Sequence, residues 1–439
     1  MFRSVSHSNS AAEAYEAARP ALRELANEGR LVEFREVTAE EVGLDESIAY
    51  VLEHPRLSPW TYPYEWSFSL LKAAALFHLE LHLDLLDKGL TLSDASAYNV
   101  QFQGPKPIFI DHLSVRPYRD GEFWLGHRQF CEQFLNPLLL RAHLDIAHNA
   151  WYRGNLEGIM TSDLARLLPI RSRLGWRVLS NVVLPAYFQK NSTSDRDVSF
   201  TTEGRKLPLA GLQSMLRQLH GWISSLQPAN KASTTWANYA STTTYDDQET
   251  TRKKEFVADF VRSSGARRVI DLGCNTGDYS KICLEIGAVA VTGFDFDQQS
   301  LDKAYARAVA ENLNFLPLFL DARNPSPAQG WMQAERGGFN ERFSADAILA
   351  LAFEHHLAIA HNVPLAQVVK WITAMAPAGV IEFVPKSDPT VRKMLALRED
   401  IFPDYTEEAF ATALARSGRI SNRLQVTESG RTLFSYVRE

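Results

Sequence analysis

The chain has 439 residues, of which 45% are hydrophobic and 22% are charged, and its formal net charge is -6. This length exceeds what one hydrophobic core usually organises, so we expect two domains. The acidic balance disfavours a domain that coats nucleic acid, and no apolar run is long enough to predict a membrane span. Three cysteines at irregular spacing fit neither a disulfide framework nor a zinc site, and with a polar N-terminus they predict a soluble, cytoplasmic protein.

Residues 1–226 are predicted to form a mainly helical domain. Apolar positions recur at three- and four-residue spacing over much of 11–90, and helical patterns return over 121–225. Between them, the short apolar runs 99–103 and 107–110 are separated by a Gly-Pro pair, which predicts a hairpin.

One group of residues in this part bears on chemistry. Asp94 and Asn99 precede the predicted hairpin, and Asp111 follows it. The arrangement resembles the catalytic loop and metal-binding strand of kinase-like phosphotransferases, in which the first Asp orients the acceptor hydroxyl while the Asn and the second Asp hold magnesium. A glycine-rich strand turn and a lysine-bearing strand are missing upstream. We therefore expect a degenerate kinase-like scaffold without metal. One alternative is a working phosphotransferase that binds metal at Asn99 and Asp111. The other is that the resemblance is a coincidence.

Residues 227–250 are rich in Ser, Thr, Asn, Asp and Ala, as an exposed segment between two domains would be. They also contain Trp236, Tyr239 and Tyr245, for which a simple linker has little use. The segment is expected either to fold over a site as a lid or to pack on the surface.

From residue 251 onward the pattern predicts alternating strands and helices. The expected strands are 268–272, 289–294, 315–319, 345–351, 379–384 and two closing strands near 420–426 and 432–437. The expected helices are 256–263, 279–286, 299–312, 365–375 and 406–415. Such alternation implies a mainly parallel sheet with helices on both faces, so residues 251–439 are predicted to be an α/β, Rossmann-like domain.

The first of these strands ends at Asp271 and runs into a turn that contains Gly273 and Gly277. Such a turn lets a ligand approach the backbone, and the free amides at the start of the next helix bind it. Asp295 ends the next strand at about the spacing expected of an acid that binds ribose hydroxyls. By spacing alone, a dinucleotide-binding dehydrogenase would begin in the same way.

The run from Val269 to Gly277 resembles motif I of class I S-adenosylmethionine-dependent methyltransferases, although Asn275 stands where glycine is usual. Asn is among the few residues that tolerate positive φ. The closing strand pair resembles the antiparallel C-terminal hairpin of that fold, and the resemblance covers residues 251–439. It implies S-adenosylmethionine as cofactor, held by Asp271, Gly273, Cys274, Asn275, Gly277, Asp295, Phe296, Asp321, Ala322 and Leu351.

The loop after the fourth predicted strand contains Glu354, His355 and His356, and it would lie beside the reacting methyl group. His356, then His355, are the predicted bases for an acceptor hydroxyl, because an ordinary histidine titrates near neutral pH. Glu382 interrupts an apolar strand and is the third candidate, since a buried carboxylate needs a partner or a raised pKa. The alternative is that one histidine packs and the other faces solvent.

Residues 384–389 and 400–405, together with the histidine pair, resemble a bacterial subgroup that includes nodulation-type methyltransferases. Asp388, Asp404 and Tyr405 either line a substrate pocket there or cap the surface. The resemblance supports a small-molecule or glycan substrate, and a histidine base suits O-methylation. We expect the substrate to be held between the two domains, and we expect no nucleic acid or membrane partner. The alternatives are a non-catalytic binding or regulatory protein and a bifunctional enzyme with N-terminal phosphotransferase activity. The sequence leaves the acceptor and the oligomeric state open.

Overall fold

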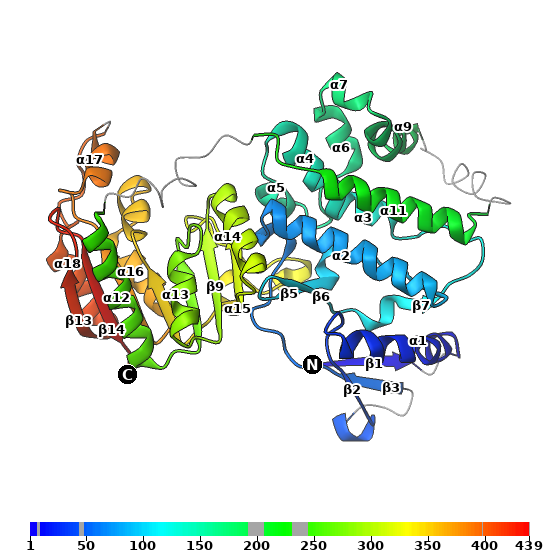
Figure 1. Ribbon diagram of the computed structural model, residues 1–439, viewed down its shortest axis with the longest axis horizontal. Helices are drawn as coiled ribbons and strands as arrows, with labels where there is room; N and C mark the ends of the chain where they lie inside the picture. The colour runs from blue at the N-terminus through cyan, green and yellow to red at the C-terminus, as the bar shows by residue number, and fades with distance from the viewer. Residues whose placement is uncertain (7–8, 44–47, 192–205, 231–244, 397, 439) are drawn as a thin grey trace. The chain divides into compact units, whose positions relative to one another are not determined.

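The computed structural model describes residues 1–6, 9–43, 48–191, 206–230, 245–396 and 398–438. The chain divides into two compact units, Met1–Lys231 and Ala232–Glu439 (Figure 1). Trp236 and Tyr239 of the predicted lid lie outside the described residues. Within the described ranges, no helix has both the length and the apolar composition needed to cross a bilayer.

The first unit begins with a small antiparallel sheet in the order β1-β3-β2. Its elements are β1 (Phe2–Ser6), α1 (Asn9–Asn27), β2 (Arg35–Val37) and β3 (Ile48–Glu53). The expectation of helix over most of residues 11–90 is wrong for β2 and β3. These strands are only 3 and 6 residues long. Period-two alternation is hard to recognise over so few residues, whereas the three- and four-residue spacing of the neighbouring helices is clear.

The rest of the first unit is mainly helical and contains the predicted hairpin, which is confirmed as β5 (Val100–Gln103) paired with β6 (Lys106–Phe109). A second pair joins β4 (Leu90–Leu92) to β7 (Val115–Pro117). The long helices α2 (Phe68–Asp87) and α11 (Leu209–Ser225) pack along one another (Figure 1). The shorter helices are α3 (His127–Phe130), α4 (Asn136–Leu144), α5 (Asn149–Gly154), α6 (Thr161–Leu167), α7 (Ile170–Arg173), α8 (Trp176–Val178) and α9 (Leu184–Asn191).

The second unit is built on a seven-stranded sheet in the order β10-β9-β8-β11-β12-β14-β13. The strands are β8 (Arg268–Leu272), β9 (Ala290–Asp295), β10 (Phe315–Phe319), β11 (Ala347–Ala350), β12 (Ala378–Phe383), β13 (Arg419–Gln425) and β14 (Thr432–Val437). The first five are mutually parallel, and β14 runs antiparallel to both of its neighbours. The predicted parallel α/β sheet with a C-terminal antiparallel hairpin is therefore confirmed.

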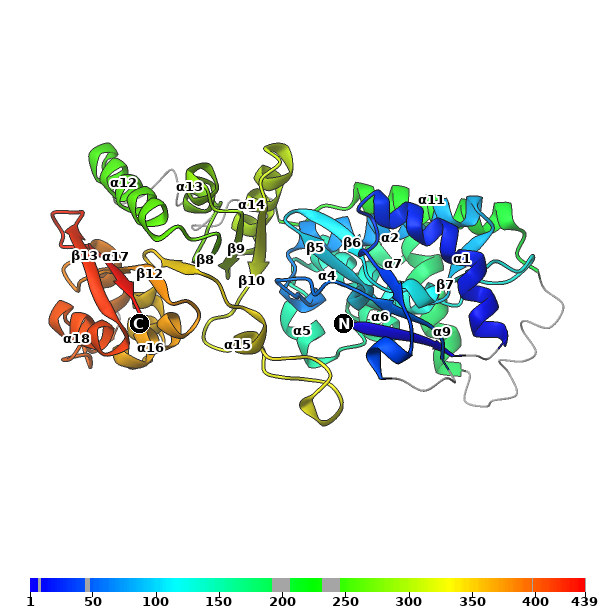
Figure 2. The same cartoon turned by 90° about the horizontal axis from the view of Figure 1, so that it is seen from below.

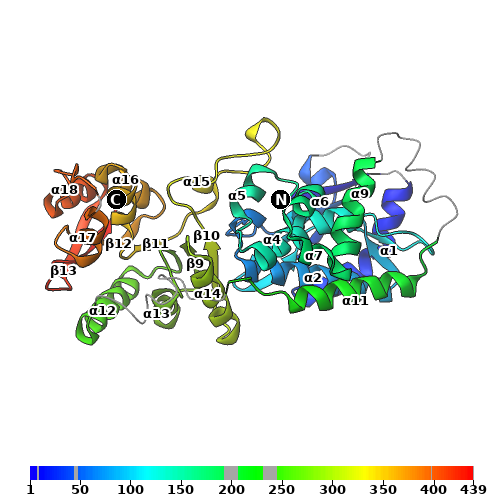
Figure 3. The same cartoon turned by 90° about the horizontal axis from the view of Figure 1, so that it is seen from above.

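Helices cover both faces of this sheet, as Figures 2 and 3 show. One face carries α12 (Asp247–Ser264), α13 (Asp278–Ile286) and α14 (Gln298–Ala310). The other carries α16 (Leu365–Ala374) and α18 (Glu407–Ser417), and the short helices are α15 (Phe339–Arg342) and α17 (Pro389–Leu395). With both faces covered, the parallel strands are largely buried, and all four residues of β11 are buried and apolar.

Helix α12 begins nine residues earlier than the predicted 256, because Asp246 and Glu249 form a capping box. The Asp246 side chain accepts a hydrogen bond from the Glu249 amide at 2.6 Å, and the Glu249 carboxylate accepts one from the Asp246 amide at 3.0 Å. The added turns bring Lys253 onto the buried face of the helix, which matters for the site.

Candidate active site

The turn between β8 and α13 has three residues in the left-handed region. Gly273, Asn275 and Gly277 have φ values of 75°, 49° and 84°. A Cβ atom at Gly277 would lie 2.5 Å from Cε1 of Phe315, so a side chain does not fit there. Asn275 adopts the positive φ that the sequence analysis considered tolerable for it. The result is a tight backbone turn at the carboxyl end of the central strand.

Asp295, at the end of β9, holds this turn in place. Its Oδ2 atom accepts a hydrogen bond from the Asn275 amide at 2.9 Å, and its Oδ1 atom accepts one from the Asp297 amide at 2.8 Å. Burial raises the pKa of Asp295 to about 6, against the lowering effect of these amides. The carboxylate therefore lies beside the glycine turn, and it is ionised above about pH 6.

Asp271 is almost fully buried beneath the turn. Ser280 of α13 donates a hydrogen bond to its Oδ2 atom at 2.6 Å, which ties the helix to the strand. Burial raises the pKa of Asp271 to about 6, and the hydrogen bond from Ser280 opposes this shift. Asp271 thus joins β8 to α13, the two elements that flank the turn.

The remaining predicted cofactor residues follow the neighbouring strand ends. Phe296 is 59% exposed, and its ring centroid lies 5.8 Å from that of Phe319. Asp321 forms a two-pronged ion pair with Arg323, with nitrogen–oxygen distances of 2.8 and 2.9 Å. Ala322 is half-buried beside them. Two further predicted residues, Cys274 and Leu351, are buried. The parallel register of β8 to β11 therefore brings the predicted set to one edge of the sheet.

Glu382 of β12 is completely buried and fully engaged. Lys253 of α12 donates to its Oε2 atom at 2.7 Å, the Ala352 amide donates to the same atom at 2.8 Å, and the Tyr245 hydroxyl donates to Oε1. Burial alone would raise the pKa of Glu382, but the charges of Lys253 and Arg431 lower it. Glu382 is thus an ionised carboxylate, and its hydrogen bond from the Ala352 amide holds the start of the loop after β11.

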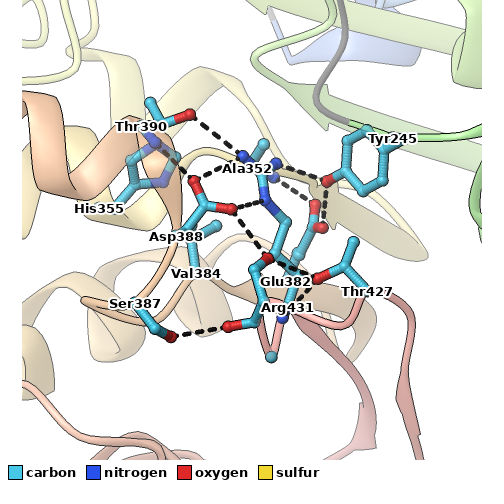
Figure 4. A network of polar contacts seen from close by, with 12 residues as sticks. Tyr245, Ala352, His355, Glu382, Val384, Ser387, Asp388, Thr390, Thr427 and Arg431 are labelled. Carbon is cyan, nitrogen blue, oxygen red and sulfur yellow. Dashed lines mark hydrogen bonds and ion pairs between the residues drawn. The ribbon is translucent and has the colours of Figure 1, made fainter.

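Arg431, in the turn before β14, extends this network (Figure 4). Its Nη1 atom donates to the Tyr245 hydroxyl at 2.6 Å, and its Nε and Nη2 atoms donate to the two oxygens of Asp388 at 2.7 and 3.0 Å. Both side chains of the Arg431–Asp388 pair are buried. Asp388 also caps α17 by accepting from the Thr390 amide at 2.8 Å. Asp388 is thus both the buried ion-pair partner of Arg431 and the N-terminal cap of α17.

The loop after β11 contains the predicted bases. Glu354 accepts hydrogen bonds from the Val384 amide at 2.8 Å and from the Tyr405 hydroxyl at 2.9 Å. Its other oxygen lies 3.3 Å from Nδ1 of His355. Burial raises the pKa of Glu354 to about 8 and lowers the pKa of His355 to about 3. A neutral carboxyl group thus faces a neutral imidazole at pH 7.

His356 is half-buried, and its ring centroid lies 4.2 Å from that of His355. Burial lowers the pKa of His356 to about 3. The prediction that these histidines titrate near neutral pH is wrong, because burial lowers the pKa of both. The structure brings Glu354, His355 and His356 together. Asp404 lies exposed in the chain before α18.

In the first unit, Asn99 and Asp111 lie together as the kinase-like resemblance implies. Nδ2 of Asn99 donates to Oδ2 of Asp111 at 3.4 Å, and Nη1 of Arg3 donates to Oδ1 of Asp111 at 2.5 Å. Asp94 accepts from the Ser96 amide at 2.8 Å. The Asp111 carboxylate is therefore hydrogen-bonded to the Asn99 amide group and to the Arg3 guanidinium group. A kinase-like origin stays a prediction.

No family model matches the chain. Nodulation protein NoeA of Rhizobium meliloti strain 1021 is 54% identical to it over 432 residues, which cover 98% of this chain and 91% of NoeA. The chain belongs to the family of the nodulation protein NoeA.

Several solved structures resemble part of this NoeA-family chain. The N-methyltransferase NodS from Bradyrhizobium japonicum is 14% identical, covering 44% of this chain and 99% of NodS with a TM-score of 0.31. Magnesium protoporphyrin IX methyltransferase from Synechocystis is 17% identical, covering 44% of this chain and 84% of that protein with a TM-score of 0.31. The methyltransferase domain of a bacterial Hen1 is 16% identical, covering 44% and 100%, with a TM-score of 0.32. Likenesses this distant say nothing about what this chain binds or transfers.

Sequence reasoning missed Lys253 and Arg431 of this NoeA-family chain. Lys253 is preceded and followed by basic residues, which suggests a solvated surface, yet Phe256, Val257 and Phe260 follow it at helical spacing. That spacing places Lys253 on the buried face and was the available signal. Arg431 stands in a polar turn far from its partners in sequence, so no local pattern indicates its burial.

Replacing Glu354 by Gln is expected to flatten the dependence of stability on pH. The folded state keeps a proton on this buried carboxyl up to about pH 8, whereas the ordinary pKa is 4.5. The folded protein therefore loses stability relative to the unfolded chain as the pH rises from about 5 to 8, by on the order of 4 kcal/mol. Gln mimics the protonated carboxyl and removes this loss.

Urea unfolding at several pH values checks this expectation. Glu354→Gln should become the more stable protein as the pH approaches 9, and its Oε1 atom can keep the hydrogen bonds from Val384 and Tyr405. Glu285→Gln, an exposed change on α13, serves as the control and should follow the wild-type profile. Parallel profiles for Glu354→Gln and the wild type would show that Glu354 does not hold the proton.

Proposed function

We propose that the second unit binds S-adenosylmethionine and transfers its methyl group to an oxygen of a small-molecule or glycan acceptor. The supporting observation is that the glycine turn and Asp295 meet at the edge of a sheet in which antiparallel β14 lies beside β12. A dinucleotide-binding dehydrogenase of the usual strand order has a parallel sixth strand at this position. The sheet order therefore favours the methyltransferase alternative.

The residues at this edge fit the cofactor. Asp295 is an ionised acceptor at the end of β9, suited to two ribose hydroxyls. The left-handed turn presents backbone with no side chain at Gly273 or Gly277, as close approach of a ligand requires. Exposed Phe296 offers an aromatic face to adenine. The cofactor would supply an electrophilic methyl group, and the chain would hold the acceptor in line with it.

His356 is the proposed proton acceptor for the substrate hydroxyl. Its neighbours Glu354 and His355 are buried and paired, whereas His356 is half-buried. Replacing His356 by Ala is expected to lower kcat by about tenfold or less, because an imidazole whose pKa is lowered to about 3 is a weak base, while the Kd for cofactor stays unchanged. Since its pKa is lowered to about 3, the neutral form is complete above about pH 4, so kcat should show no histidine limb near pH 6.5.

Single-turnover rates across pH 5 to 8 measure this effect. His361→Ala is the matched control, because His361 ends the same helical turn and is exposed. An unchanged kcat for His356→Ala would remove His356 from the reaction and leave proton transfer to solvent.

The direct test of the function is transfer of an isotope-labelled methyl group from S-adenosylmethionine to a bacterial metabolite or glycan extract. NoeA is named for nodulation, so we propose an acceptor made by root-nodulating bacteria as the first to try. Calorimetry that shows no S-adenosylmethionine binding by folded protein would refute the proposal. Cofactor binding without transfer to any acceptor would instead favour a binding or regulatory protein. That alternative is compatible with Glu382 and His355, because both are buried against other residues of the chain.

A further inference from the structure

Exposed apolar side chains gather over a short stretch of the first unit, around α7 and α8. Ile170 is 73% exposed, Leu174 74% and Trp176 74%, and Leu167 is also exposed. The stretch is anchored from beneath, because Leu164, Leu168, Val178 and Val182 are buried. Helix α6 packs against α9 on the same part of the unit, which Figure 1 shows as a group of short helices. Clustered exposure on an anchored surface is typical of an interaction site.

Arginines are interleaved with these apolar residues. Residues 160–187 contain four arginines and one acidic residue, in a chain whose net charge is -6. Arg173 donates to the Leu168 and Arg166 carbonyl oxygens at 2.7 Å each, so it stabilises the turn between the helices. Arg171 and Arg177 are exposed. The surface is thus locally cationic.

We propose that this α7–α8 surface, formed by Leu167, Ile170, Arg171, Leu174, Trp176 and Arg177, docks on an anionic lipid bilayer. An indole ring suits the boundary between headgroups and acyl chains, and aliphatic side chains enter the layer below it. Arginine stems lie along apolar surface while their guanidinium groups bind lipid phosphates. The absence of an apolar run long enough to span a bilayer predicted no membrane partner, but a peripheral contact of this kind needs no spanning segment.

The alternation of charge and apolar area favours a bilayer over a protein partner. Arginines flank each exposed apolar side chain here. Protein interfaces also use Arg and Trp, but a protein partner would have to place an acidic group opposite each arginine, whereas an anionic bilayer presents phosphates across its whole surface. A single-stranded nucleic acid would use the arginines and Trp176, but Ile170 and Leu174 would have nothing to contact. A lipid surface uses both kinds of side chain.

Co-sedimentation of the full chain with vesicles tests the proposal. The protein is expected to bind phosphatidylcholine vesicles that contain phosphatidylglycerol and not to bind pure phosphatidylcholine vesicles. Binding should weaken as the salt concentration rises. Arg171→Glu with Arg177→Glu should weaken binding by roughly 25-fold or more, from about fivefold per arginine. The matched double reversal Arg252→Glu with Arg416→Glu, at exposed helix positions of the second unit, should leave binding unchanged.

A second pair of variants tests the apolar contribution. Trp176→Ser should weaken vesicle binding with all charges intact, while Trp331→Ser, at a site 77% exposed, should not. Arg171→Lys with Arg177→Lys should retain binding, which separates loss of charge from loss of folding.

Equal binding to neutral vesicles, or none to anionic vesicles at low salt, would overturn the proposal. So would a dimer in sedimentation that Leu174→Ser dissociates without any vesicle binding, because the occupant would then be a second copy of this chain. Binding of single-stranded RNA in place of vesicles would overturn it equally.

Discussion

Replacing Asp295 by Ala is expected to abolish measurable S-adenosylmethionine binding at micromolar cofactor, a loss of roughly 100-fold in Kd. Each hydrogen bond from a ribose hydroxyl to a carboxylate contributes about 1.5 kcal/mol or more, and two of them give about 3 kcal/mol. The substitution also removes the acceptor that holds the Asn275 amide, so the turn itself loosens. Isothermal calorimetry with S-adenosylmethionine and its demethylated product measures the effect.

Two further variants serve as controls for Asp295→Ala. Ser280→Ala loosens α13 beneath Asp271 and leaves Asp295 in place, so it should reduce affinity much less. Asp259→Ala, at an exposed position of α12, should have no effect. If Asp295→Ala bound cofactor as the wild type does while staying folded, the proposed site would be wrong.

The same carboxyl predicts how binding varies with pH. Its pKa in the protein is about 6, and the proposed hydrogen bonds from ribose hydroxyls would need the ionised form. Affinity should therefore be constant above about pH 7 and should fall below pH 6, by up to tenfold per pH unit for one proton. The pKa of the neighbouring Asp271 is also about 6. Protonation of Asp271 would make the affinity fall more steeply with decreasing pH only if it changed the conformation of the glycine turn.

Replacing Glu382 by Gln is expected to destabilise the second unit by about 3–5 kcal/mol. The change leaves Lys253 buried without its counter-charge, and an uncompensated charge in the interior is the costly element of a broken ion pair. Gln is nearly isosteric, so little of the loss comes from a cavity. Urea unfolding measures the loss of unfolding free energy. Faster hydrogen exchange of the β12 amides would assign that loss to the second unit.

The double variant Glu382→Gln with Lys253→Met provides the control. Removing both charges should restore most of the lost stability, since the unpaired ammonium group is gone. Replacing the exposed Asp259–Arg262 pair by Asn and Met should change stability by less than about 1 kcal/mol. A double variant as unstable as the single one would mean that Arg431 or Tyr245, rather than Lys253, needs the Glu382 charge.

The sequence predicted the central strands well for a physical reason. Strands β8, β10 and β12 are largely buried on both faces, so each is mostly apolar, with Asp271 of β8 and Glu382 of β12 as the buried acidic exceptions. The glycine turn and Asp295 were predictable for the same reason, because they follow directly from two such strands. The strands β2 and β3 lack this signal, since they are short and only partly buried.

The interior of the candidate site was less predictable. Glu382 was expected to need a partner, but its partner Lys253 stands in a basic run, and Arg431 contacts Tyr245 across 186 positions of sequence. Glu354 is buried where the Val384 amide and the Tyr405 hydroxyl, both distant in sequence, donate hydrogen bonds to it. A pKa set by such long-range contacts cannot be derived from the local sequence.

The hydrogen bonds of Tyr245 also decide where the second unit can be cut. Its hydroxyl joins Glu382 of β12 to Arg431 of the turn before β14, so residues at both ends of this unit complete one buried network. A fragment that starts at α12 would lack the Tyr245 hydroxyl, and one that stops before Arg431 would leave Asp388 buried without its counter-charge. The shortest autonomous fragment of this protein must therefore contain Tyr245 at one end and both closing strands at the other.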